Sequence, residues 1–381
     1  MNEPPLDFES PQTLDPQRQQ KAKEYARISR RLFIAELIFG AVYVLFWIFS
    51  GLSPWLRNQV HTVAQATWLA VPLFALGFGL PYTLLTAPLS YYSGFVLPHR
   101  YGQSTQSLPG WLLDQLKGLA LSGVLGLIVL EIIYVLLGAA PQTWWLWAAL
   151  AMLLFTVLLS NLAPVLIFPL FYKYRPLDNE ELVNRLTRLA ENAGARVKGV
   201  YAFDMSRKTV AANAAVMGLG NTRRIVLGDT LIDNFTVDEI ETVLAHELGH
   251  HVHKDVAKGI VVQSLLTLGG FWLADRLMQW GIAALGYTGL TDPAALPLLL
   301  VALALFGLVT MPLSNGWSRW REVKADTYAL QTTRNPQAFI SAMTRLANQN
   351  LADAEPPAWV EFLLHSHPSI SKRVAMARQF G

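Results

Sequence analysis

The sequence predicts a mostly helical integral membrane protein with a folded α+β part outside the membrane. Only 15% of the 381 residues are charged, against about 25% in a typical soluble domain. Apolar residues make up 52% of the chain, so a soluble globule of this size could not cover its surface with polar side chains. Six long apolar runs, nearly free of charge, alternate with polar segments, two of which have the pattern of folded structure.

Each of the six runs is long enough to cross a bilayer, which takes about 20 residues in a helix. A buried helix of a soluble core is the alternative for a single run, but six such runs in one chain favour membrane spans. The second run is long for one crossing, so we expect a tilted helix broken near Pro72 or Pro81, or a re-entrant pair. We expect six spans, with seven as the alternative. The runs are residues 32–51, 63–97, 118–138, 143–172, 258–285 and 295–314.

The distribution of basic residues predicts the orientation. Six spans place both termini on one side, and loops rich in Lys and Arg mark the cytoplasmic side. The opposite loops contain only Arg57, with Arg276 near a helix end. The polar parts are therefore predicted to be cytoplasmic. Almost all Lys and Arg lie in the N-terminal tail, 98–117, 173–257 and the C-terminal segment.

Three parts of the chain follow from this pattern. Residues 1–31 form a polar cytoplasmic tail, and residues 32–172 form a membrane domain of about four spans. Residues 173–381 form a folded domain that two further spans interrupt. No apolar run begins early enough to be a signal peptide.

Composition excludes several kinds of site. The chain has no Cys, so a disulfide framework, a thiolate nucleophile and a Cys-based metal site are all excluded. The net charge is only +3, and no Arg/Lys cluster alternates with aromatic residues. Nucleic-acid binding is therefore not expected. A metal site would have to use His, Asp or Glu.

Two polar blocks read as folded structure. The first, residues 173–255, combines helical and strand patterns, and the second, from about residue 315 to the end, reads as helices. Pro368 interrupts the last pair of helices. The predicted elements are a helix with Leu182, Leu186 and Leu189 on one face that ends at Gly194, strands at 197–204 and 223–227, a helix opened by a Thr236–Glu239 capping box, and a helix that begins at Asn335.

The capped helix contains a metal-binding motif, His246-Glu247-Leu248-Gly249-His250. Histidines four residues apart lie on one helix face, one turn apart, so both rings can bind one Zn²⁺. Glu247 would then stand beside the metal, where it can take a proton from a bound water molecule. His251 and His253 lie off the shared face, and we interpret them as bystanders.

A catalytic zinc site needs a third protein ligand. Glu322 and Asp326 are four residues apart on one predicted helix face. One carboxylate can bind the metal while the other accepts the free N–H of a zinc-bound His. From spacing alone a solvated, salt-bridged helix face is the more common explanation. His367 can stabilise an oxyanion, although a structural role is more common for a single His.

The chain resembles the membrane zinc metallopeptidase family that includes the type I CAAX prenyl endopeptidase. The metal helix is shared with many zinc peptidases, but the ordered set of blocks from about residue 80 onward is far more specific. The blocks are Phe95–Leu97 with Tyr101-Gly102, Ala163-Pro164, Pro169–Phe171, Pro176-Leu177, Ser206–Lys208, Asn213-Ala214 with Gly218, Arg224–Leu227, Asp229–Leu231, His246–His250, Ser318–Asp326, and His367-Pro368 with Arg373.

The resemblance implies roles for individual residues. It makes Glu322 the third zinc ligand and Asp326 a carboxylate that supports the ligands without touching the metal. It makes His367 an oxyanion-stabilising residue and Arg373 a supporting residue near the active centre. Asn213 and Ala214 fall in the segment that, in such peptidases, binds the substrate backbone as an added strand.

The resemblance also implies a fold. Membrane helices would surround a large water-filled chamber, with a zincin-like metallopeptidase domain on the cytoplasmic side. Two departures point to a smaller chamber or a different substrate entrance. Eukaryotic members have seven spans, one more than expected here, and the missing span precedes about residue 63. Pro98-His99 replaces the acidic pair that often follows the Phe-Val block.

The predicted function is therefore zinc-dependent endoproteolysis, with one Zn²⁺ per chain and a peptide or protein substrate, prenylated or membrane-embedded. A bacterial or archaeal cell membrane is the expected location, and the sequence leaves the oligomeric state open. The shorter heat-shock membrane peptidases, which act in quality control, are the alternative within the clan. A zinc-binding membrane scaffold or transporter is a second alternative, to which Glu36 and Glu131 inside predicted spans would contribute a polar pathway. A zinc hydrolase of lipid esters is a third.

Overall fold

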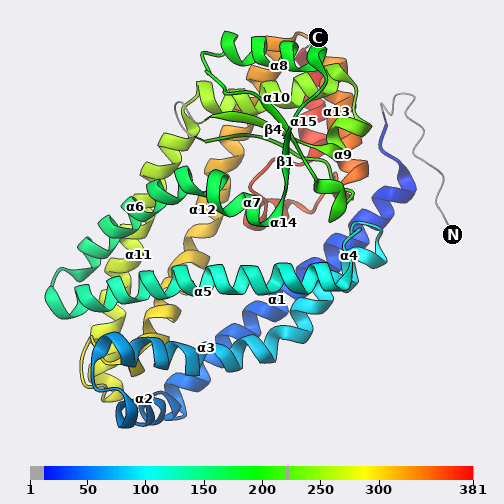
Figure 1. Ribbon diagram of the computed structural model, residues 1–381. Coiled ribbons are helices and arrows are strands. Elements are labelled where there is room, and N and C mark those ends of the chain that lie inside the picture. The colour runs from blue at the N-terminus through cyan, green and yellow to red at the C-terminus, as the bar shows by residue number, and fades with distance from the viewer. Residues whose placement is uncertain (1–12, 219–222, 381) are drawn as a thin grey trace.

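The computed structural model describes residues 13–218 and 223–380. A small sheet with its helices lies at one end of the molecule, and the short helix α2 (Leu52–Val63) lies at the other (Figure 1). Long helices run between the two ends. The architecture is therefore a membrane-type helical frame that carries a folded α+β part at one end.

Six helical segments of the described residues are long and apolar enough to cross a membrane, as predicted. In three of them, a short π-helical or 3-10 segment joins two consecutive α-helices or precedes the α-helix. The segments are α1 (Pro16–Phe49), α3 (Thr67–Tyr91) with η1 (Tyr92–Val96) and α4 (Leu97–Arg100), α5 (Leu108–Ala139), α6 (Trp144–Leu162) with η2 (Ala163–Ile167) and α7 (Phe168–Phe171), α11 (Asp255–Leu285), and η5 (Pro293–Ala295) with α12 (Leu296–Thr333).

The second span is one helix, so the break expected near Pro72 or Pro81 and the re-entrant pair are both wrong. Each proline removes one backbone hydrogen bond, yet α3 runs on through Pro72, Pro81 and Pro88. Buried packing of Val71, Phe74 and Phe78 holds the helix in place. The 12-residue α2 precedes it and is too short to span a bilayer.

The first helix begins well before the first apolar run. Pro16 occupies its first turn, and the Asp15 side chain accepts hydrogen bonds from the backbone N–H groups of Gln17 and Arg18. The Arg18 Nε donates to the backbone oxygen of Asn348 at 2.7 Å. Residues 16–31, expected as a polar tail, are thus helical and dock on the C-terminal helices. Residues 1–12 of that tail lie outside the described part.

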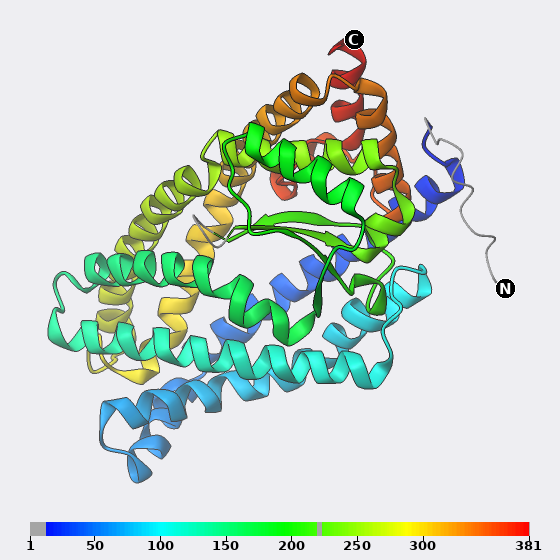
Figure 2. The same ribbon diagram turned by 45° about the horizontal axis from the view of Figure 1, so that its top comes forward.

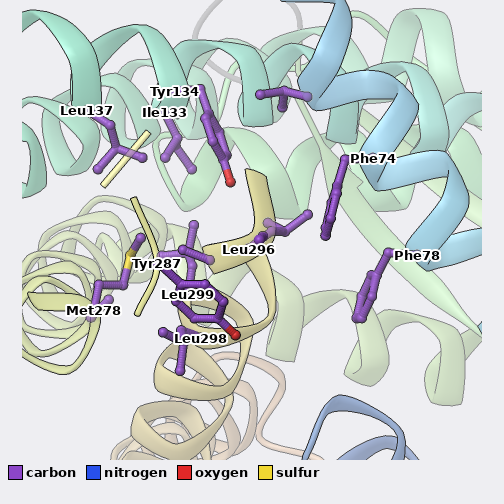
Figure 3. Packing of buried hydrophobic residues seen from close by; sticks show 14 of the residues in the cluster. Phe74, Phe78, Ile133, Tyr134, Leu137, Met278, Tyr287, Leu296, Leu298 and Leu299 are labelled. Atoms are coloured by element: carbon purple, nitrogen blue, oxygen red, sulfur yellow. The ribbon is translucent and has the colours of Figure 1, made fainter. Parts of the chain in front are cut away.

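Side chains from several spans pack into one apolar core. Phe74 and Phe78 of α3, Ile133, Tyr134 and Leu137 of α5, Met278 of α11, and Leu296, Leu298 and Leu299 of α12 belong to it (Figure 3). This core joins α11 and α12, which come from the C-terminal half of the sequence, to the N-terminal spans. The two halves of the chain are therefore built as one helical frame.

The sheet has four strands in the order β1-β2-β4-β3. The strand β2 pairs parallel with β4, while β3 pairs antiparallel with β4 and forms one edge of the sheet. Both predicted strands are present as β2 and β4, and the short β1 and β3 are additional. The strands are β1 (Tyr174–Pro176), β2 (Val200–Phe203), β3 (Ala214–Met217) and β4 (Arg224–Gly228).

Helices cover one face of the sheet (Figure 2). Leu182 and Leu186 of α8 (Glu180–Asn192) share a buried cluster with Ile225 of β4 and Leu244 of α10 (Val237–Val252). The predicted capping box is present at the start of α10, because the Thr236 side chain accepts from the Glu239 N–H and the Glu239 side chain accepts in return. The remaining helices are η3 (Met205–Arg207), α9 (Asp229–Asn234), α13 (Pro336–Gln349), α14 (Ala358–Leu364) and α15 (Ile370–Phe380).

Candidate metal centre and active site

Two helices bring the predicted ligands together. Helix α10 carries His246 and His250 one turn apart, with ring centroids 4.9 Å apart and ring planes at 89°. Helix α12 brings Glu322 against them from 72 residues further along the chain. One ligand atom from each of the three side chains lies within 4.8 Å of the other two. The arrangement can hold one metal ion.

The donor atoms have the spacing of ligands around a shared ion. The Nε2 of His246 is 3.2 Å from Oε2 of Glu322, and the Nε2 of His250 is 3.5 Å from Oε1. Ligand atoms around a tetrahedral zinc ion lie about 3.3 Å apart, given bonds of about 2.0–2.2 Å. The Oε2 atom is buried and has no hydrogen-bond partner among the described residues. A buried carboxylate oxygen without a partner fits a metal ligand and is costly otherwise.

The second ring nitrogen of each histidine donates to a carboxylate. The Nδ1 of His246 donates to Oδ1 of Asp326 at 2.7 Å, and the Nδ1 of His250 donates to Oδ2 of Asp255 at 2.9 Å. These bonds leave both Nε2 atoms free to face Glu322. The structure thus places Asp326 beside His246 and also places Asp255 beside His250, a residue that the sequence analysis missed. Its position five residues after His250, at the start of the next helix, was the available signal.

Arg373 of α15 fixes Asp326 from the other side. Its Nε donates to Oδ2 of Asp326 at 2.8 Å, and a second nitrogen donates to Oδ1. This two-point contact matches the planar guanidinium to the carboxylate. The arginine and the aspartate are both largely buried, with side chains 10% and 1% exposed. Arg373 therefore supports His246 through Asp326.

Glu247 lies between the two histidines in sequence and faces a cavity of about 540 Å³. Burial raises the pKa of its carboxyl above the ordinary value, and the charges of His246 and His250 oppose that rise. A carboxylate with a raised pKa is a better proton acceptor, as a general base requires. The cavity is lined by Val216, Gly218, Arg223, Glu247, His250, His251, Lys254, Asp255, Val256, Ala257, Ile260, Arg321 and Glu322.

His367 lies close to Glu322. Its Nε2 is 3.5 Å from Oε1 of Glu322, and its side chain is 59% exposed. Arg319 of α12 holds the segment before it, since its Nη1 donates to the backbone oxygens of Glu361 and His365. The structure therefore brings His367 to the edge of the site, on a loop that Arg319 positions.

His251 on α10 and His253, at the C-cap of that helix, are not part of the ligand cluster. The Nδ1 of His253 lies 2.8 Å from the backbone oxygen of Gly249. His251 lines the cavity beside the metal centre. Neither side chain belongs to the group of His246, His250 and Glu322 that could hold an ion.

Asn213 and Ala214 lie at the edge of the sheet. The backbone oxygen of Asn213 accepts from the Gly228 N–H at 2.9 Å, and Ala214 begins β3. Since β3 pairs only with β4, its other edge has no strand partner among residues 13–218 and 223–380. Val216 of the same strand lines the Glu247 cavity. An extended peptide added to this edge would pass the metal centre.

Comparisons with known proteins agree with this geometry. Residues 176–380 match the model of peptidase family M48, and residues 1–173 match the model described as CAAX prenyl protease N-terminal, five membrane helices. Within residues 13–173 of that region, which the structure describes, there are four candidate spans and the short α2.

Individual relatives cover nearly the whole chain. It is 32% identical over 362 residues to an uncharacterized metalloprotease, YhfN, of Bacillus subtilis, covering 94% of this chain and 85% of the relative. It is 29% identical to the probable CAAX prenyl protease 1 of Schizosaccharomyces pombe, covering 95% and 79%. The crystal structure of Ste24p from S. mikatae has the same fold, with a TM-score of 0.86 at 24% identity over 96% of this chain and 90% of that chain. The chain therefore belongs to peptidase family M48 and is a membrane metalloendopeptidase of the type I CAAX prenyl protease kind.

Proposed function

We propose that the chain hydrolyses peptide bonds with one zinc ion held by His246, His250 and Glu322. The observation that carries the proposal is the convergence of these three side chains, with Glu247 beside them in the cavity. Two His and one Glu, with a further position left open, are a donor set used by catalytic zinc in peptidases. When bound, zinc polarises the scissile carbonyl and lowers the pKa of a water molecule.

The side chains of the protein carry the proton transfers. Glu247 accepts the proton of the attacking water and later delivers it to the leaving amine. Its raised pKa suits both steps, because the group must bind the proton and release it near neutral pH. His367 donates a hydrogen bond to the developing oxyanion. Loss of one such donor typically costs about 10²–10³ in rate.

The remaining site residues orient these groups. Asp255 and Asp326 each fix one zinc-binding histidine through its Nδ1 atom, and Arg373 fixes Asp326. The free edge of β3, with Asn213 and Ala214 at its start, binds the substrate backbone as an added strand. The substrate is thus a peptide in extended conformation, presented beside the membrane.

The distribution of Lys and Arg along the chain indicates its orientation in the bilayer. The parts of the chain that hold the metal centre also hold most of the Lys and Arg, which supports a cytoplasmic active site in a bacterial or archaeal cell membrane. The CAAX prenyl proteases among the relatives support a prenylated substrate. The metalloprotease of Bacillus subtilis matches over a similar length, and its name states no lipid requirement.

The test is cleavage of a peptide panel by the purified protein in detergent or lipid. Each peptide is supplied with and without a prenyl group, and products are placed by mass spectrometry. We expect a chelator to abolish cleavage and added zinc to restore it. Both Glu247→Gln and His246→Ala should also abolish cleavage. Glu247→Gln should still bind zinc, which His246→Ala should not. Undiminished cleavage by either variant would refute the mechanism, and stoichiometric zinc without any cleavage would favour a scaffold. Equal rates with and without the lipid would remove only the prenyl requirement.

A further inference from the structure

Three cationic side chains line the cavity beside the metal centre. They are Arg223, just before β4, Lys254, between α10 and α11, and Arg321, next to Glu322 on α12. They come from three separate parts of the fold, yet all reach one cavity of about 540 Å³. Such a concentration of positive charge is unexpected for a site that holds a divalent cation.

None of the three forms an ion pair with a carboxylate in the described parts of the chain. The carboxylates that line the same cavity already have other tasks. Asp255 accepts from His250, Glu322 faces both histidines, and Glu247 lies beside them as the base. The positive charge of the cavity is therefore left for a ligand that enters it.

Arg321 is held in place without being neutralised. Its guanidinium lies 4.2 Å from the centre of the Trp317 ring, and its Nη1 donates to the backbone oxygen of Asp255 at 3.1 Å. Its Nε is buried and has no hydrogen-bond partner in the described structure. The guanidinium keeps its positive charge, and a carboxylate that enters the cavity can accept hydrogen bonds from its terminal nitrogens.

Lys254 is positioned by an unusual backbone. It has φ 56° and ψ 38°, in the left-handed region, at the junction of α10 and α11. This turn joins the metal helix to a membrane span and places an exposed ammonium group at the cavity wall. Val256, Ala257 and Ile260 on the first turns of α11 add an apolar wall next to it.

We propose that this cavity binds a carboxylate of the peptide substrate close to the bond that is cleaved, with Arg321 and Lys254 as its main contacts and Arg223 adding charge. The proposal rests on the proposed peptidase function. Glu247 and Val216 of β3 line the same cavity. A carboxylate bound there can therefore belong to the same peptide whose backbone pairs with the edge of β3. A free C-terminus that follows an apolar residue supplies both the carboxylate and the group for the apolar wall. An acidic side chain supplies the carboxylate alone.

The first experiment uses the unmodified protein and distinguishes these two sources. One peptide is supplied as its C-terminal acid and its amide, and a second pair carries Asp or Asn at each position near the cleavage site. We expect the preferred carboxylate peptide to exceed its neutral partner about ten- to hundredfold in kcat/KM, as for a hydrogen-bonded charge. A difference in the acid–amide pair assigns the C-terminus, and one in the Asp–Asn pair assigns the side chain.

The second experiment places the effect on the named residues. Arg321→Gln and Lys254→Gln should each lose most of the preference, measured as the ratio of kcat/KM for the carboxylate peptide to kcat/KM for its neutral partner. Lys324→Gln on α12 and Lys258→Gln on α11 remove a charge one turn away, outside the cavity lining, and should keep the full preference. Zinc content and thermal unfolding of every variant show whether the fold and the metal centre are retained. If Arg321→Gln loses zinc, the preference is measured in Arg321→Lys and Lys254→Gln instead.

Three results would overturn the proposal. One is equal kcat/KM for both members of every peptide pair in the unmodified protein. Another is a preference that persists in Arg321→Gln and Lys254→Gln proteins that contain zinc. The third is a preference that follows the anionic lipid content of the vesicles instead of the peptide. Failure of the proposed function looks different, because no peptide would then be cleaved in a Glu247-dependent way.

Discussion

Gly249 on α10 lies directly against Ala325 on α12. A Cβ atom built on Gly249 would lie 2.9 Å from the Cα and 3.1 Å from the backbone oxygen of Ala325. The two helices can approach this closely because Gly249 has no side chain. This contact lies between His246 and His250 in the sequence of α10, and between Glu322 and Asp326 in that of α12. The close approach therefore sets how near the two sets of metal-site residues come.

We predict that Gly249→Ala separates the two helices and weakens the metal centre. The added methyl group meets backbone atoms, which cannot move aside as a flexible side chain can. We expect a loss of about 1–3 kcal/mol in unfolding free energy, the usual cost of overpacking, together with weaker zinc binding. Thermal unfolding and zinc titration measure both effects. Gly307→Ala, on α12 where a Cβ meets nothing within 4 Å, is the matched control; equal behaviour of the two variants would contradict the prediction.

Asp255→Ala should lower zinc affinity about 10- to 100-fold, the usual effect of removing a partner of a metal-binding histidine. The His250 ring would lose the acceptor that fixes its orientation. Asp255→Asn should have a smaller effect, because an amide oxygen can still accept from Nδ1. Competition with a chelating dye measures the affinity, and Asp233→Asn on α9, which is exposed, serves as control. An unchanged affinity in Asp255→Ala would show that His250 needs no such partner.

Arg319→Gln should reduce kcat while zinc binding is retained. Its guanidinium holds the backbone of Glu361 and His365, just before His367. Without it the loop can move, so the oxyanion loses its donor for part of the time. The loss should not exceed that of His367→Ala, about 10²–10³, and the double variant should be no worse than His367→Ala alone. If the losses in kcat of the two single variants multiply in the double variant, Arg319 does not act through His367.

Arg57→Leu should destabilise the end of the frame that is far from the metal centre. Arg57 of α2 pairs with Asp292 at 2.7 Å, and the Asp292 side chain is fully buried. Breaking a buried pair from one side leaves an uncompensated charge and costs about 3–5 kcal/mol. The melting temperature in detergent should fall, and Arg57→Leu/Asp292→Asn should recover part of the loss. Arg188→Leu, on the exposed side of α8, should melt as the parent does.

Local patterns in the sequence predicted much of the fold. Apolar runs located the spans, and the capping box located the start of α10, because both depend on neighbours in the chain. His246 and His250 were recognisable for the same reason, being one helical turn apart. The contact of Glu322 with them depends on how α12 packs against α10, which spacing cannot show. Resemblance to a family supplied that ligand, and the structure brings it to the site.

Other features of the fold and the site could not be predicted from the sequence, for physical reasons. The strand β3 has only four residues, too few for a clear alternation of side chains. The start of α1 at Pro16 was missed because the turns before the apolar run are polar and dock on other helices. Asp255 marked only the end of the first polar block in the sequence, and its bond to His250 depends on the left-handed turn at Lys254.

Helix α12 has a consequence beyond the site itself. It runs without interruption from Leu296, in the apolar core of the spans, to Glu322 and Asp326, a rise of about 40 Å. Its lower part must match the thickness of the surrounding hydrocarbon, and helices answer mismatch by tilting. We expect tilt of such a rod to shift Glu322 relative to the histidines on α10, so that zinc retention should depend on the acyl chain length of the surrounding lipid.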